Sequence, residues 1–280
     1  PRNGRQFISQ TRFFARSDMS FKSGRELEVV LLVRSADPLS TLRRIADLPS
    51  VRGYLLRAGP SKRIHDVYFD TPEGSLGARR MNLRIREWGG SYWITWKRSL
   101  GLLGWRRKER RELELPWSRE SLSRTITELA KSKIILNEPP QFDRFHPIET
   151  VKGTGLRVLQ DRETSRLVRN VVKSTADGEV LVELAIDSVF YHFESQVVEL
   201  HELEVEAKAK KGRKILEDVK DGLLDLFGGE LHPWRWGKLV TGEMIRKMLE
   251  GGVLQGLLDG SRLTPEAVER VTKALETREF

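Results

Sequence analysis

Residues 201–208 read HELEVEAK and place a carboxylate at every second position, at Glu202, Glu204 and Glu206. In a β-strand alternate residues lie on one face, so the three carboxylates share a face and the apolar residues between them lie on the other. Like charges this close repel one another unless water, an ion or an opposite charge separates them. The segment therefore predicts a strand whose polar face needs a counter-charge.

Other predicted strands show the same alternation. The polar face is acidic in some of them, basic in others and of mixed charge in one. The charged residues of these faces are Glu26 and Glu28; Arg84 and Arg86; Lys97; Lys108, Arg110, Glu112 and Glu114; Glu183 and Asp187. A single strand of this kind is ordinary, because a half-buried antiparallel strand turns its polar face to water. If the polar faces instead point into a barrel, they line a charged tunnel. Carboxylates there would hold Mg²⁺ or Mn²⁺, and Arg and Lys would hold phosphate oxygens.

Turn and helix signals give the order of elements. Short strand-like runs with Gly- and Pro-rich turns predict mainly antiparallel pairing, and helical spacing predicts helices such as those capped by Asp37 and Thr264. We expect an α+β fold: a closed antiparallel β-barrel of about eight strands forming a charged tunnel, with flanking helices. Residues 1–24 are expected to form a flexible basic arm, 25–250 the tunnel domain and 251–280 a C-terminal helical extension.

Composition limits the classes of function. The chain has 280 residues, a net charge of +9 and no cysteine, which excludes disulfides and thiolate metal sites and favours anionic partners. No apolar run is long enough to span a bilayer, and residues 1–20 lack the apolar region of a signal peptide. A cytoplasmic location is expected. An organellar one stays open because the chain begins with a basic segment and no Met.

Seven segments, taken in order, resemble the motifs of one known family. They are ELEVV (26–30), DVYFDTP (66–72), LRIR (83–86), ITWKR (94–98), RRELELP (110–116), VELAIDS (182–188) and HELEVEAK (201–208). Together they are similar to the CYTH domain, or triphosphate tunnel metalloenzyme, family. DRETSR (161–166) and GKLVTG (237–242) resemble two further family segments. One motif alone would be weak, but seven in the right order with matching alternation are specific.

The resemblance implies a chemistry and a role for particular residues. It implies metal-dependent hydrolysis of inorganic triphosphate or a related triphosphorylated compound, with Mg²⁺ or Mn²⁺ as cofactor and release of phosphate. Asp187 would hold an arginine or a second ion. The implied residues are, for catalysis, Glu26 and Glu28; for phosphate binding, Arg84, Arg86, Lys97, Arg110, Arg166 and Lys238; and for metal binding, Glu202, Glu204, Glu206 and Asp187.

One residue departs from the family pattern and keeps other functions open. The first motif ends in Lys in the family, whereas this chain has Val30. One alternative is a class IV-type adenylate cyclase, which converts ATP to cyclic AMP and pyrophosphate. Another is a non-catalytic module that binds polyphosphate or RNA. Neither a membrane partner nor a particular oligomeric state is predicted.

Overall fold

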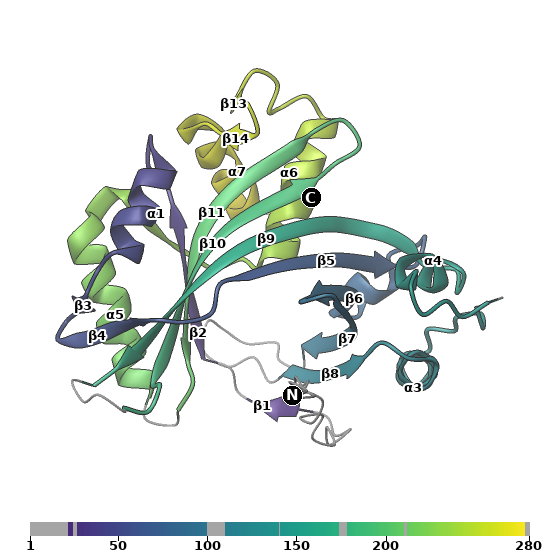
Figure 1. Ribbon diagram of the computed structural model, residues 1–280. Coiled ribbons are helices and arrows are strands. Elements are labelled where there is room, and N and C mark those ends of the chain that lie inside the picture. Colours follow the sequence, from purple (N-terminus) through teal and green to yellow (C-terminus); the bar gives the residue numbers. More distant parts are fainter. Residues whose placement is uncertain are drawn as a thin grey trace, which may run out of the picture.

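The computed structural model describes residues 22–24, 27–99, 110–139, 141–173, 178–209 and 212–277. All fourteen described strands belong to one curved sheet, shown in Figure 1. Its order is β1 (Lys22–Gly24), β8 (Arg110–Pro116), β7 (Ser91–Ser99), β6 (Met81–Trp88), β5 (Lys62–Asp70), β9 (Arg157–Val172), β10 (Val182–His192), β11 (Val197–Ala207), β14 (Arg262–Leu263) and β13 (Leu258–Asp259).

Shorter strands branch from this path. β2 (Glu28–Val33) pairs with β11 and with β12 (Leu231–Trp234), and β4 (Tyr54–Ala58) pairs with β9 and with β3 (Ser50–Val51). The pairing is antiparallel except between β11 and β14.

The expected α+β class and antiparallel sheet are confirmed, but the closed barrel is not. Among the described residues β1 pairs only with β8, and β2 pairs only with β11 and β12, so the sheet stays open between them. Alternation in a sequence fixes the face on which a residue lies, but it does not fix which strands meet at the edges of a sheet.

Helices cover the sheet on both sides. They are α1 (Pro38–Ala46), α2 (Ser75–Ala78), α3 (Arg119–Ala130), α4 (Pro147–Lys152), α5 (Gly212–Phe227), the 3₁₀ helix η1 (Gly228–Glu230), α6 (Lys238–Glu250) and α7 (Pro265–Thr277). The predicted caps are confirmed: Asp37 accepts a hydrogen bond from the Ser40 amide at 3.1 Å, and Thr264 accepts one from the Ala267 amide at 3.2 Å. None of the described helices is long and apolar enough to cross a membrane.

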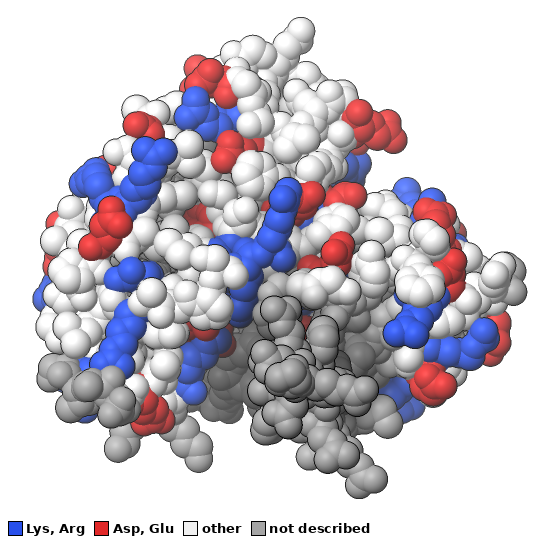
Figure 2. Space-filling model, in the orientation of Figure 1, with Lys and Arg blue, Asp and Glu red and all other residues white. Residues whose placement is uncertain are grey.

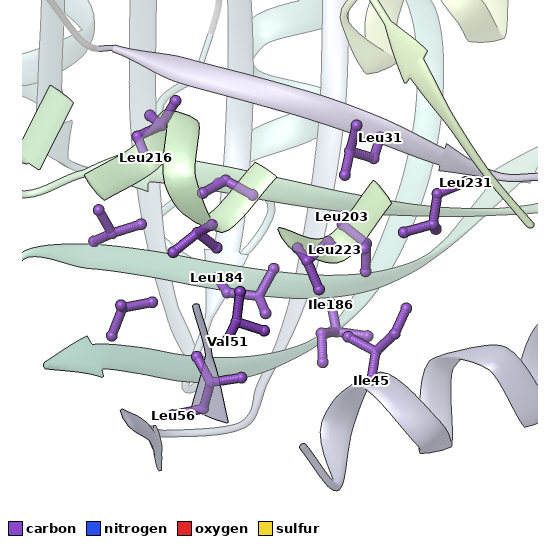
Figure 3. Close-up of a cluster of buried hydrophobic side chains, with 14 of the residues drawn as sticks. Leu31, Ile45, Val51, Leu56, Leu184, Ile186, Leu203, Leu216, Leu223 and Leu231 are labelled. Atoms are coloured by element: carbon purple, nitrogen blue, oxygen red, sulfur yellow. The ribbon is translucent and has the colours of Figure 1, made fainter. Parts of the chain in front are cut away.

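The apolar faces of the strands form three buried clusters. The first lies between β2, β10 and β11 and the helices α1 and α5; Figure 3 shows Leu31, Leu184 and Leu203 pointing into it. The second lies between β5–β8 and the helices α2–α4. The third joins β2, β10 and β11 to α6 and α7. The helices α1 and α5 therefore cover one face of β2, β10 and β11. The helices α6 and α7 pack on part of the opposite face, which also carries the charged residues.

The start of α6 is held tightly against the sheet. Gln160 donates a hydrogen bond to the carbonyl of Leu239 at 3.1 Å, and Tyr191 donates one to the carbonyl of Lys238 at 3.0 Å. Gly242 permits this approach, because a Cβ there would lie 2.2 Å from Gln160 Nε2 and 2.5 Å from the Tyr191 ring. These contacts fix the position of Lys238 above the strands.

The division of the chain into an arm, a tunnel domain and an extension stays a prediction. β1 lies within the segment 1–24, which was expected to be an arm. β13, β14 and α7 lie within the segment 251–280, where α7 packs in the third cluster.

Candidate functional site

Three carboxylates on neighbouring strands form a compact cluster, called here the carboxylate cluster: Asp187 on β10, and Glu202 and Glu204 on β11. Asp187 lies directly opposite Glu202 in the β10–β11 ladder. One carboxylate oxygen from each residue lies within 4.8 Å of the others. Asp187 and Glu202 are almost wholly buried, with 0% and 1% of their surfaces exposed. Three anions buried this close require cations.

Two cations meet the carboxylate cluster. The ammonium group of Lys238, at the start of α6, lies 3.0 Å from Asp187 and 2.5 Å from Glu204, and it also donates to Glu202. The guanidinium of Arg166, on β9, donates two hydrogen bonds to Asp187 at 2.8 and 2.6 Å and another to Glu204. Two residues expected to bind phosphate thus neutralise residues expected to bind metal.

The pKa values follow from these contacts. Burial alone would raise the pKa of Glu204, but Lys238 and Arg166 hold it well below its usual value. Burial raises the pKa of Glu202 to about 6, although Lys238 opposes the rise. Burial would lower the pKa of Lys238, yet the three carboxylates raise it well above its usual value. Lys238 therefore stays charged at neutral pH.

The donor set of the carboxylate cluster fits a divalent cation. Mg²⁺ and Mn²⁺ prefer oxygen ligands, and carboxylates are their usual protein ligands. The Oε2 atom of Glu202 is buried and has no hydrogen-bond partner among the described residues. A buried polar atom of this kind needs an occupant to satisfy it. The cluster could therefore hold such an ion if Lys238 and Arg166 moved toward another anion.

A second charged group, called here the arginine cluster, surrounds Asp66 on β5. Arg86 donates to Asp66 at 2.7 and 2.9 Å, Arg162 donates at 2.8 Å, and Arg84 lies 3.6 Å away. The hydroxyl of Tyr68 accepts a hydrogen bond from Arg84 and another from Arg162, both at 3.1 Å. Arg84 also lies 3.8 Å from a second carboxylate, Glu114. Three guanidinium groups therefore meet two carboxylates and one hydroxyl, so the group keeps an excess of positive charge.

Tyr191 connects the two clusters across the same face of the sheet. It lies opposite Arg162 in the β9–β10 ladder, and its hydroxyl donates to the Lys238 carbonyl. The carboxylate cluster and the arginine cluster thus lie side by side, which is an arrangement suited to a ligand with many negative charges and a bound cation.

The charge on Tyr68 is expected to control anion binding at high pH. Burial alone would raise its pKa, but Arg162 and Arg84 lower it to about 8. Above that pH the phenolate competes for both arginines, so the affinity for a polyanion should fall with rising pH, by up to ~tenfold per pH unit. The phenolate absorbance and the dissociation constant of a polyanion should change over the same pH range. Tyr68→Phe should remove the decline, and a decline that persists in this variant would assign it to another group.

The other predicted residues lie apart from these clusters. Lys97 pairs with Glu112 at 2.9 Å. Glu206 contacts Lys208 at 2.6 Å and lies opposite Glu28 in the β2–β11 ladder, toward the far end of β11. Glu206 is thus not part of the carboxylate cluster, although alternation places it on the same face. Glu28 is exposed.

Two of the predicted site residues have no described side chain. Glu26 lies outside the described residues. Arg110 begins β8, but only its backbone is described.

Sequence reasoning missed Asp66, Tyr68 and Arg162 as site residues, although all three lie in segments that carried the family resemblance. The available signal was the strand alternation already used elsewhere. Arg162 has the same parity as Arg166, and Asp66 has the same parity as Tyr68 and lies opposite both Arg86 and Arg162.

Comparison with known proteins assigns the fold to a family. Residues 39–228 match the family model of the CYTH domain. None of the curated proteins compared matches the chain.

The chain is also similar to solved structures that are distant in sequence. A proposed adenylyl cyclase from Hippeastrum, described as having a dominant triphosphatase activity, is 16% identical and has a TM-score of 0.46, covering 78% of this chain and 94% of its own. A proposed adenylate cyclase from Bacillus halodurans is 19% identical, with a TM-score of 0.44 and coverage of 77% and 96%. A protein from Pyrococcus horikoshii OT3 is 14% identical, with a TM-score of 0.43 and coverage of 79% and 98%.

Proposed function

Since the chain belongs to the CYTH domain family, we propose that it hydrolyses inorganic triphosphate or a related triphosphorylated compound in a reaction that needs a divalent cation. One observation carries the proposal: the carboxylate cluster and the arginine cluster share one face of the sheet and are joined through Tyr191. Carboxylates suit a hard cation, and guanidinium groups suit phosphate oxygens.

In this proposal the arginine cluster binds the polyphosphate. Its three guanidinium groups, from Arg84, Arg86 and Arg162, are positively charged hydrogen-bond donors. Asp66 and Tyr68 already hold these side chains in position. Because these groups already point at one place, little ordering is needed when phosphate oxygens arrive. Positioned cations also stabilise the charge that develops on a transferring phosphoryl group.

Asp187, Glu202 and Glu204 would hold Mg²⁺ or Mn²⁺, and the bound ion would supply charge neutralisation at the phosphate oxygens. Lys238 and Arg166, released from these carboxylates, would turn to the anion. The role of Glu28 in orienting the attacking water rests on the family resemblance alone, because Glu28 lies across from Glu206 and away from the carboxylate cluster.

Lys238 is expected to compete with a metal ion for the carboxylate cluster. Lys238→Met removes an ammonium group from 3.0 Å of Asp187 and 2.5 Å of Glu204, so Mn²⁺ affinity without triphosphate should rise, on the order of tenfold. Triphosphate affinity should fall, because the same lysine would bind the anion. Calorimetric titration with each ligand measures both effects.

Lys97→Met is the matched control, because Lys97 pairs with Glu112 outside the carboxylate cluster. Its Mn²⁺ affinity should not change. Unchanged Mn²⁺ affinity in Lys238→Met would show that the ammonium group does not occupy the metal position.

The experiment that tests the function is product analysis. The protein is incubated with inorganic triphosphate or ATP in Mg²⁺, Mn²⁺ or EDTA, and phosphate and pyrophosphate are measured separately. Metal-dependent phosphate release from triphosphate is the expected result. Pyrophosphate release from ATP would assign the cyclase reaction instead.

A non-catalytic polyphosphate-binding module is the second candidate, and Val30 favours it. Val30 replaces the family lysine, lies opposite Glu204 in the β2–β11 ladder and packs against the third apolar cluster. Position 30 therefore supplies no cation to Glu204, whose cations come from β9 and α6 instead. Metal-independent binding of triphosphate without turnover would establish this candidate.

A further inference from the structure

A ligand-sized pocket lies beside the carboxylate cluster. It has a volume of about 470 Å³ and lies between α1, the start of β5, β9 and β10. Pockets that hold small organic ligands commonly have volumes of about 300–1,000 Å³. The size of this pocket therefore suits a small molecule rather than a single ion.

The charge of the pocket lining is entirely positive. Arg43 comes from α1, and Lys62 and Arg63 come from β5; the described lining contains no Asp or Glu. Arg166 of β9 also lines the pocket, but Asp187 and Glu204 neutralise its guanidinium. Figure 2 shows Lys and Arg side chains gathered at the centre of this face, between α1 and β5 as Figure 1 places them. A concave surface with charge of one sign concentrates ligands of the opposite sign.

Three of these cations are available to a ligand. Arg43 is exposed and has no ion-pair partner among the described residues. Arg63 pairs with Glu163 at 2.8 Å, but 80% of the arginine side chain is exposed, so this pair contributes little and can exchange. Lys62 lies with its ammonium group 5.2 Å from the centre of the Trp88 ring and has no carboxylate partner in the part of the chain described.

The remaining lining is amphipathic. Ser165 and Ser188 supply hydroxyl groups at one side. Leu42, Leu167 and Ile186 supply an apolar surface. A bare oxyanion would use the cations and hydroxyls alone, whereas a ligand with an apolar body would also use the aliphatic surface.

We propose that this pocket is a binding site for an organic phosphate monoester, with the phosphate on Arg43 and Arg63 and the apolar body against Leu42 and Ile186. The site is separate from the carboxylate cluster. Arg166 lies between them, because it lines the pocket while its guanidinium is held by Asp187 and Glu204. The proposal does not rest on triphosphate hydrolysis and would hold for a catalytic or a non-catalytic chain.

The test compares matched ligands in EDTA, without divalent cations. Phenyl phosphate, inorganic phosphate and phenol are titrated into the full chain by calorimetry. Phenyl phosphate should bind at least ~tenfold more tightly than phosphate, because its ring buries apolar surface. Phenol should bind too weakly to measure. Equal affinities for phenyl phosphate and phosphate, or no binding of phenyl phosphate, would overturn the proposal.

Variants locate the binding. Arg43→Glu should weaken phenyl phosphate binding at least ~tenfold, and Ser165→Asp, at an exposed strand position of the lining, should do the same. Arg213→Glu on α5 makes the same charge change at an exposed position outside the pocket and should have less than ~twofold effect. Arg86→Gln, in the arginine cluster, separates the two sites: a loss of phenyl phosphate affinity there as large as in Arg43→Glu would place the binding in the arginine cluster and overturn the proposal. Equal losses in Arg43→Glu and Arg213→Glu would show general charge attraction and would overturn the site.

Discussion

Replacing Glu204 with Gln is expected to lower metal-dependent triphosphate hydrolysis by at least ~10²-fold, whereas Glu206→Gln should lower it far less. Loss of an outer-shell partner alone typically costs 10–100-fold in metal affinity or activity, and Glu204 is proposed as a direct ligand. Glu204 lies in the carboxylate cluster with Asp187 and Glu202. Glu206 instead contacts Lys208. The two residues have the same chemistry and the same strand face, so the pair tests position alone.

Steady-state phosphate release over a range of Mn²⁺ concentrations measures this difference. The Glu204→Gln protein should keep its fold, because Lys238 and Arg166 still contact Asp187, and thermal unfolding checks this. Equal losses in the two variants would place the metal site nearer the end of β11 than the carboxylate cluster.

Asp66→Asn should give the second large effect, a loss of about 3–5 kcal/mol in the free energy of unfolding without ligand. Removing one member of a buried ionic group leaves the partner charges uncompensated, and losses of this size are typical. Asp66 is 1% exposed and receives hydrogen bonds from Arg86 and Arg162. Its pKa is lowered mainly by Arg84 and Arg86 against the effect of burial, so the carboxylate is charged at neutral pH.

Triphosphate should restore part of this stability. The three arginines left around residue 66 repel one another, and an anion between them supplies the missing negative charge. Denaturant unfolding with and without triphosphate in EDTA measures the recovery. Asp161→Asn is the control, because Asp161 forms a partly exposed pair with His65 and should cost less than ~1 kcal/mol. A triphosphate-induced gain no larger in Asp66→Asn than in the control would separate the arginine cluster from anion binding.

Strand alternation placed several residues of the candidate site on the polar faces of their strands. It placed Glu202 and Glu204 on the polar face of one strand and Asp187 on that of another, and the ladder between β10 and β11 brings the three together. It also placed Arg84 and Arg86 on a common face, and both lie at Asp66. A period of two is robust, because a change in face would bury charges and expose the core.

The pairing of these charges could not be predicted in the same way. Which cation meets which carboxylate depends on register between strands far apart in the sequence and on the docking of α6. Glu206 has the parity of Glu204, yet its place along β11 separates it from the cluster. Arg162 and Arg166 share a face, but Arg162 lies opposite Asp66 while Arg166 lies opposite Asp187. The odd or even position of a residue in its strand gives the face on which its side chain lies, and the register between strands decides which residue lies next to it.

The close approach at Gly242 sets the distance between the start of α6 and the sheet. A side chain there would meet Gln160 and the Tyr191 ring, the residues that hold the first turn of α6 and so the backbone of Lys238. Position 242 thus acts as a spacer between a helix and a sheet. The size of the residue at position 242 therefore determines how closely the Lys238 ammonium group approaches the carboxylate cluster, while every charged residue stays the same.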